Sequence, residues 1–156
     1  MKEKLGQKDK PADLDGAIAA LSTGDEARRF LGAKDAKAAY ALLAPHESKR
    51  AGEVDFDYLL GVAAIDAGDP QRAVIALERV LAMQPDFHVA RAEIARAYFV
   101  LGERTNAQRE FRAVREQTAV PNEARLTIDK YLSALEPART RLQGYLEGSF
   151  GHDSNV

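Results

Sequence analysis

The sequence predicts an all-α protein, a superhelix of antiparallel helix pairs that repeat along one chain. Alanine is the commonest residue, which suits both helix formation and the close approach of packed helices. A 34-residue internal period divides much of the chain into similar units. Glycine and proline stand at the ends of the periodic segments, where helices stop and start. The chain has 156 residues, which is enough for a single domain with its own core.

The period appears when residues 54–87 are aligned with residues 88–121, a shift of 34 positions. The matched positions hold residues of the same size class: Leu60 with Ile94, Gly61 with Ala95, Gly68 with Gly102, Ala73 with Ala107, Leu77 with Phe111, and Val80 with Val114. Such matches at one fixed offset predict two copies of one structural unit. A lone helix pair cannot bury its apolar stripe, so we expect the units to stack.

Each copy divides into two helical segments joined by a glycine turn. In the first copy, apolar residues recur at helical spacing up to Gly68, which suits a helix C-terminus. Asp69 and Pro70 then fit the N-cap and first position of a second helix, which stops before Pro85. Gly102 marks the same turn in the second copy.

The residue sizes indicate how the helices pack. We expect small residues where two helix backbones approach most closely, at Gly61, Ala73, Ala95 and Ala107. We expect large residues to fill the space between pairs, at Leu77, Tyr98 and Phe111.

The flanking segments predict further helices. Upstream, residues 26–31 and 36–43 fit a shortened helix pair that Pro45 ends, with a polar connection over residues 46–54. Residues 13–21 are compatible with one more helix. Downstream, residues 121–136 fit the first helix of a third unit or a capping helix.

The units resemble tetratricopeptide repeats (TPR), which are helix–turn–helix units of 34 residues. The residues that carry the resemblance are Leu60, Gly61, Gly68, Asp69, Ala73, Leu77 and Pro85, then Ile94, Ala95, Tyr98, Gly102, Ala107 and Phe111. Ala64 departs from the usual aromatic residue, and Ala119 from the usual final proline. The resemblance implies about 2.5–3.5 repeats plus a capping helix.

The pattern changes after Pro137. Over residues 145–150, Tyr145, Glu147 and Ser149 alternate with Leu146, Gly148 and Phe150, which is typical of a strand. A lone strand has no partner in a helical solenoid. The interpretation is therefore either a frayed terminus or the first strand of a further domain.

A short TPR array followed by Gly-Ser-Phe-Gly-His-Asp-Ser-Asn-Val at 148–156 resembles the surface lipoprotein assembly modifier (Slam) family. In that family a periplasmic TPR domain precedes an outer-membrane β-barrel, whose first strand begins with a similar motif. His152 replaces the usual aromatic residue. The implied organisation is a flexible segment at 1–16, a TPR domain at 17–136, and a linker with the start of a truncated barrel at 137–156.

The resemblance implies a non-enzymatic interaction module in the periplasm, attached to the outer membrane in the full-length protein. Its partners would be a protein or peptide client, such as a lipoprotein, and its own C-terminal barrel. Two alternatives stay open. One is a free-standing TPR scaffold or adaptor, cytoplasmic or periplasmic, and the other is the TPR part of an exopolysaccharide-export barrel protein.

Charge and composition argue against several other classes. The formal net charge is -2, so no basic field predicts nucleic-acid binding. The apolar runs fall far below the ~20 residues of a membrane-spanning helix. The chain has no cysteine, and its three histidines lie far apart in sequence. Asp55 and Asp57 are best explained as first-turn charges favoured by the helix dipole. We expect no catalytic residue, cofactor or metal site.

The inward positions of the repeats predict a peptide groove with apolar walls and charged fixtures. The candidate residues are Tyr58, Asp66, Arg96, Phe99 and Lys130. Ala92 and Leu126 also fall at inward positions, whereas Val62, Ile65 and Val100 are expected to be core between repeats. The mixed charges of residues 104–117 predict a solvated helix face with weak ion pairs.

Overall fold

A computed structural model describes residues 12–137, and all regular structure among them is helical. The helices are α1 (Ala12–Gly32), α2 (Ala36–Leu43), the 3₁₀ turn η1 (Ala44–His46), α3 (Glu47–Arg50), α4 (Val54–Ala67), α5 (Pro70–Met83), α6 (His88–Leu101), α7 (Arg104–Arg115) and α8 (Asn122–Leu135). The predicted all-α class is therefore confirmed for these residues. The strand-like pattern at 145–150 lies outside the described residues.

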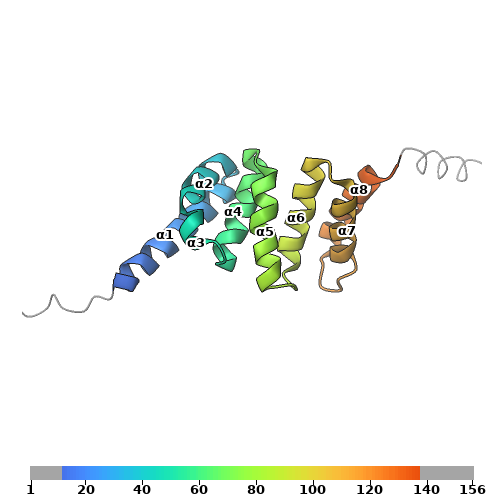
Figure 1. The fold of residues 1–156 in the computed structure, drawn as a ribbon. Coiled ribbons are helices and arrows are strands. Elements are labelled where there is room, and N and C mark those ends of the chain that lie inside the picture. The colour runs from blue at the N-terminus through green and yellow to red at the C-terminus, as the bar shows by residue number, and fades with distance from the viewer. Residues whose placement is uncertain (1–11, 138–156) are drawn as a thin grey trace, which may run out of the picture.

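The helices pack as successive antiparallel pairs. α1 packs on α2, α4 on α5, and α6 on α7, while α8 follows as a single helix against α7. Figure 1 shows the pairs stacked side by side in chain order, with the first half of α1 extending beyond the stack. α4 and α6, the first helices of the two copies, also contact each other directly. The stacking that the 34-residue period predicts is thus present.

The two glycine turns form as the sequence predicts. Gly68 and Gly102 adopt left-handed backbone angles, with φ of 96° and 76°, which residues with a Cβ rarely adopt. The Asp69 side chain caps α5 by accepting a hydrogen bond from the Arg72 amide at 3.2 Å. Pro70 is the first residue of α5, where a missing amide proton costs nothing.

The small residues lie where the paired helices approach most closely. A Cβ added at Gly61 would lie only 2.6 Å from Cγ of Leu77, so α4 can approach α5 only because this position lacks a side chain. Ala73, Ala95 and Ala107 are fully buried. These contacts confirm the packing that the residue sizes predict.

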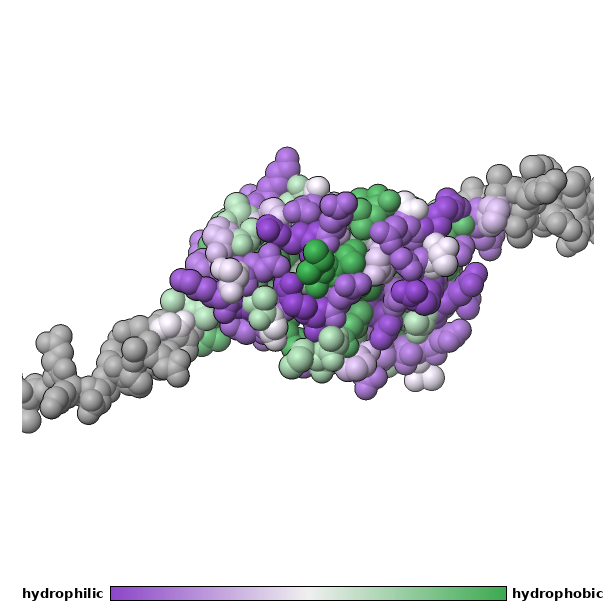
Figure 2. Space-filling model, in the orientation of Figure 1, coloured by the Kyte–Doolittle hydropathy of each residue, from purple (hydrophilic) through white to green (hydrophobic). Residues whose placement is uncertain are grey.

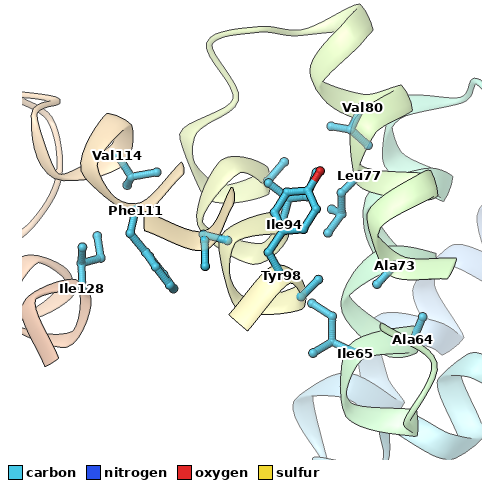
Figure 3. Packing of buried hydrophobic residues seen from close by; sticks show 14 of the residues in the cluster. Ala64, Ile65, Ala73, Leu77, Val80, Ile94, Tyr98, Phe111, Val114 and Ile128 are labelled. Atoms are coloured by element: carbon cyan, nitrogen blue, oxygen red, sulfur yellow. The ribbon is translucent and has the colours of Figure 1, made fainter. Parts of the chain in front are cut away.

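The large residues fill the space between pairs. Figure 3 shows Ile94 and Tyr98 of α6 between Leu77 of α5 and Phe111 of α7. The Tyr98 hydroxyl donates a hydrogen bond to Glu78 of α5 at 3.0 Å. Burial, together with that carboxylate, raises the pKa of Tyr98 to about 12. α6 is therefore packed on both sides, and the hydrogen bond of the Tyr98 hydroxyl helps to hold α6 against α5.

The N-terminal region differs from the sequence prediction. α1 is one continuous helix from Ala12 to Gly32, where the sequence suggested separate segments at 13–21 and 26–31 and a flexible stretch up to residue 16. Within the polar run, the Thr23 hydroxyl donates a hydrogen bond to the Ala19 carbonyl one turn earlier, a contact that a helix accommodates. The polar connection over residues 46–54 contains the short helix α3.

Asp57 plays a larger part than a first-turn charge. Its side chain is fully buried and accepts hydrogen bonds from Arg79 of α5 at 2.7 and 3.0 Å. It also accepts from the Gly52 amide at 2.7 Å, and Arg79 reaches Glu47 of α3 at 2.8 Å. The bond to Asp57 outweighs burial and raises the pKa of Arg79 further above its usual range. This network connects α3, α4 and α5.

The contact between Gly61 and Leu77 can be tested by adding one methyl group. We expect Gly61→Ala to lower the free energy of unfolding by about 1–2 kcal/mol, because overpacking outweighs the gain in helix propensity. Urea unfolding followed by circular dichroism measures the change.

The matched control is Gly32→Ala, since a Cβ there meets nothing within 4 Å, and we expect a change within about 0.5 kcal/mol. In a Leu77→Ala background the cost of Gly61→Ala should disappear. An equal cost in both backgrounds would show that the clash is not with Leu77.

Candidate protein-binding groove

An apolar groove lies between α6 and α8, with a volume of about 580 Å³. Its floor is formed by Phe111 and Val114 of α7 and by Ile128 of α8, which Figure 3 shows close together. The remaining lining residues are His88, Val89, Ala92, Glu93 and Arg96 of α6, Ala119, Val120 and Pro121 of the α7–α8 loop, and Ala124, Thr127 and Tyr131 of α8. Most of these side chains are apolar or small, as in sites that bind apolar ligand groups.

Aromatic contacts position α8 along the groove. Tyr131 stacks on Phe111 of α7, with ring centroids 4.7 Å apart, and meets Phe99 of α6 edge-on at 5.0 Å. Arg115 of α7 forms an ion pair with Asp129 of α8. These contacts hold α8 against α7 while its other side faces the groove.

The α7–α8 loop is fixed by one arginine side chain. Arg125 of α8 donates hydrogen bonds to the carbonyls of Gln117 at 2.7 Å and Val120 at 3.1 Å. Pro121 then precedes the first residue of α8 and closes one end of the groove. The groove wall therefore includes a loop whose backbone polar groups are largely satisfied.

Arg96 lies at the α6 edge of the groove, between two carboxylates. Its guanidinium contacts Asp66 of α4 at 2.6 Å and Glu93 of α6 at 2.8 Å. Burial alone would lower the pKa of Arg96, but the hydrogen bonds to both carboxylates outweigh it and raise that pKa. Two carboxylates thus share one guanidinium, which leaves this edge with an excess of negative charge.

Tyr58 occupies the neighbouring junction between α4 and α6. Its ring stacks on Phe87, with centroids 5.1 Å apart and an angle of 29° between the planes. Burial is the main cause that raises the pKa of Tyr58, Glu93 raises it further, and Arg96 opposes both. Tyr58 therefore lies in the electric field of the same charged pair that borders the groove.

The structure brings together some of the predicted site residues. Tyr58, Asp66 and Arg96 meet at the α4–α6 junction, and Arg96 also lines the groove. Phe99 is half-buried beneath Tyr131. Lys130 is exposed on α8 and lies outside the groove lining. The binding role of all five residues stays a prediction.

One core prediction for this face is wrong. Val100 is 55% exposed, and Asp66, which the 34-residue shift aligns with it, is exposed as well. Ile65 is buried as predicted, and Val62 is half-buried. Leu126, at a predicted inward position, is 63% exposed and does not line the groove.

Sequence reasoning missed the residues that define the groove on the α8 side. Ala124 and Thr127 line it together with Pro121. The side of α8 that faces α6 is equivalent to the side of α6 that faces α4. The signal was present in the 34-residue alignment. This signal appears when the residues on both sides of one junction are compared with those on both sides of the next junction, instead of one inward position at a time.

The charged face of α7 also differs from expectation. Two of its arginines bond to α8: Arg104 to the Leu135 carbonyl, and Arg115 to Asp129. Glu110 is nearly buried and pairs with Arg91 of α6 at 2.8 Å. One intrahelical pair, Arg109 with Glu110 at 2.9 Å, is present as predicted, and the other contacts hold neighbouring helices together.

Two other surface features are less suited to apolar binding. A hollow of about 860 Å³ lies between α1 and α4, and Arg50, Glu53 and Asp55 make its wall more polar. Figure 2 shows that the face in view is mainly hydrophilic, with hydrophobic side chains gathered over its middle, where α5 lies. The groove between α6 and α8 is therefore the stronger candidate site.

A family model for the tetratricopeptide repeat matches residues 64–127, which run from the second half of α4 into α8. These residues form tetratricopeptide repeats. The predicted TPR fold is thereby confirmed, and the TPR is a repeat that mediates protein–protein interaction. None of the described helices combines the length and the apolar character that a membrane span requires.

The chain is also similar to a surface lipoprotein assembly modifier of Moraxella catarrhalis. The two sequences are 30% identical over 79 residues, which is 51% of this chain and 16% of that protein. The chain thus spans a small part of its relative's length. The TPR domain resembles the Slam family, as its sequence suggests.

The charged pair beside Tyr58 can be tested through the pKa of that tyrosine. We expect Arg96→Gln to raise the pKa of Tyr58, because a neighbouring positive charge is lost, and Glu93→Gln to lower it. NMR titration of Cζ in ¹³C-labelled tyrosine measures both shifts.

Tyr40 provides an internal control, because the charged groups that act on it are Asp69 and Arg72. Its pKa should stay unchanged in both variants. If the pKa of Tyr58 moved in the same direction in both variants, the geometry at the α4–α6 junction would have to be different.

Proposed function

We propose that this chain is the client-binding TPR domain of a protein that helps lipoproteins or other secreted proteins reach the cell surface. The similarity to a surface lipoprotein assembly modifier is the observation that carries the proposal. In this proposal the domain acts in the periplasm, next to an outer-membrane barrel that belongs to the same full-length protein. It binds the client before the client crosses the outer membrane.

The geometry of the groove supports a polypeptide client. Its floor is apolar, its α6 edge carries the Asp66, Glu93 and Arg96 cluster, and α6 and α8 form its two walls. Such a groove suits an extended or helical segment that buries apolar side chains while its backbone stays near polar groups. Its mainly apolar lining offers few hydrogen-bonding groups to the hydroxyls of a polysaccharide.

Site-specific photo-cross-linking tests the proposal. A photoreactive phenylalanine analogue is placed at Thr127, on the groove wall, and in a matched variant at Ile75 on α5, which is 54% exposed and lies outside the groove. Each purified variant is mixed with a tagged surface lipoprotein that lacks its acyl chains. We expect cross-links from position 127 and at least tenfold fewer from position 75.

Two controls separate the alternatives. A tagged soluble periplasmic protein should not cross-link, and equal cross-linking of that protein would instead support a general TPR scaffold. Added exopolysaccharide should not compete, and full competition would support the polysaccharide-export alternative. Absence of lipoprotein cross-links from position 127 would contradict the proposed function.

A further inference from the structure

We propose that the groove between α6 and α8 binds one bulky apolar side chain, preferably aromatic, of a client segment that carries a basic residue beside it. This inference rests on the proposed function, since it names the feature of the client that the TPR domain recognises. It follows from a comparison of two equivalent junctions within the chain.

The first junction, between α4 and α6, is filled by the chain itself. Tyr58 of α4 stacks on Phe87, the residue that precedes α6, and the two rings pack against the core between the helices. The hollow between α1 and α4 reaches this junction at Val54 and Phe87, but Tyr58 lines neither that hollow nor the groove between α6 and α8. An aromatic pair is thus what this repeat geometry accommodates between successive first helices.

The second junction, between α6 and α8, lacks that pair. A shift of 34 positions places Ala92 at the position of Tyr58 and Pro121 at the position of Phe87. Both residues line the groove. The groove is therefore the space that an aromatic ring occupies one repeat earlier. The side chain that fits it best has the shape and polarity of such a ring.

The surrounding side chains suit an aromatic occupant. Phe111, Val114 and Ile128 are almost fully buried below the space, and the Tyr131 ring forms part of its wall. An apolar ring in the groove therefore adds contacts with a dry floor, and it removes apolar surface from water mainly on the walls, where Val89 is 54% exposed and Ala124 is exposed. An aromatic ring also gains edge or stacking contacts with Tyr131.

The charges at the α6 edge indicate the neighbouring residue. Asp66 and Glu93 share the single guanidinium of Arg96, so a further cation beside the ring would find an uncompensated carboxylate. Arg125, at the loop end, directs its guanidinium to backbone carbonyls. On α8, Lys130 and Glu123 are both exposed outside the lining and carry opposite charges. Charge complementarity therefore favours a basic residue on the α6 side.

The test fills the groove in the way that the chain fills its first junction. Ala92→Tyr should place a ring where Tyr58 lies one repeat earlier, and Ala41→Tyr, at an exposed position of α2 outside the groove, is the matched control. The probe is a capped peptide, Gly-Ser-Phe-Arg-Ser-Gly, titrated into ¹⁵N-labelled protein. Two further peptides replace its phenylalanine by alanine, or its arginine by glutamate.

We expect the amide signals of α6 and α8 residues around the groove to shift with the first peptide. Its Kd should rise at least tenfold for the alanine peptide and severalfold for the glutamate peptide. Ala92→Tyr should abolish the shifts without lowering the melting temperature, while Ala41→Tyr should leave the Kd unchanged. Thr127→Trp, which covers the groove from α8, is the second blocking variant should Ala92→Tyr fail to fold.

Two results would overturn the inference: undiminished binding to a folded Ala92→Tyr or Thr127→Trp variant, or equal binding of the phenylalanine and alanine peptides. Its failure is distinguishable from failure of the proposed function. Lipoprotein cross-linking from position 127 that persists in the Ala92→Tyr variant would contradict the proposed pocket but still support a lipoprotein client. Peptide binding without lipoprotein cross-linking would support the proposed pocket but contradict a lipoprotein client.

Discussion

The close approach of paired helices is the constraint on which the rest of the structure depends. α4 reaches α5 because Gly61 has no side chain to collide with Leu77, and the second pair has the small, buried Ala95 and the buried Phe111 at the equivalent positions. Once each pair is formed at this spacing, its outer apolar residues must be covered by the next pair. The spacing therefore determines where α4, α6 and α8 lie relative to one another, and with it the size of each junction.

Ion pairs reinforce the stack where it contains polar side chains. Asp57 would be a costly buried charge without Arg79 and the Gly52 amide, and Glu110 of α7 is paired with Arg91 of α6 within the second unit. Breaking such a pair leaves one charge without a partner in a poorly solvated place, which is strongly destabilising. Because each pair joins two helices, it also favours one relative position of those helices over others.

The parts of this fold that follow local rules could be predicted from the sequence. Gly68, Asp69 and Pro70 determine a turn through backbone angles and capping, and the 34-residue offset requires only comparison of the chain with itself. The burial of Asp57 could not be predicted, because it depends on partners from other elements, Arg79 and the Gly52 amide. The exposure of Val100 could have been predicted, because the 34-residue shift aligns it with the charged Asp66. The candidate site was predicted in part: the face was identified, but the cavity on it depends on pairs of residues from different repeats.

The two junctions show how a repeat scaffold can acquire a binding site without a new fold. The filled junction is stabilised by the stacking of Tyr58 on Phe87. The open junction lacks that contact, because Ala92 and Pro121 occupy the equivalent positions. An open junction is thus less stable on its own than a filled one, since apolar surface along its walls, such as that of Val89, stays uncovered. A bound side chain restores the missing contact, so client binding and domain stability are coupled. Filling the groove from within should consequently stabilise the domain while it removes the binding site.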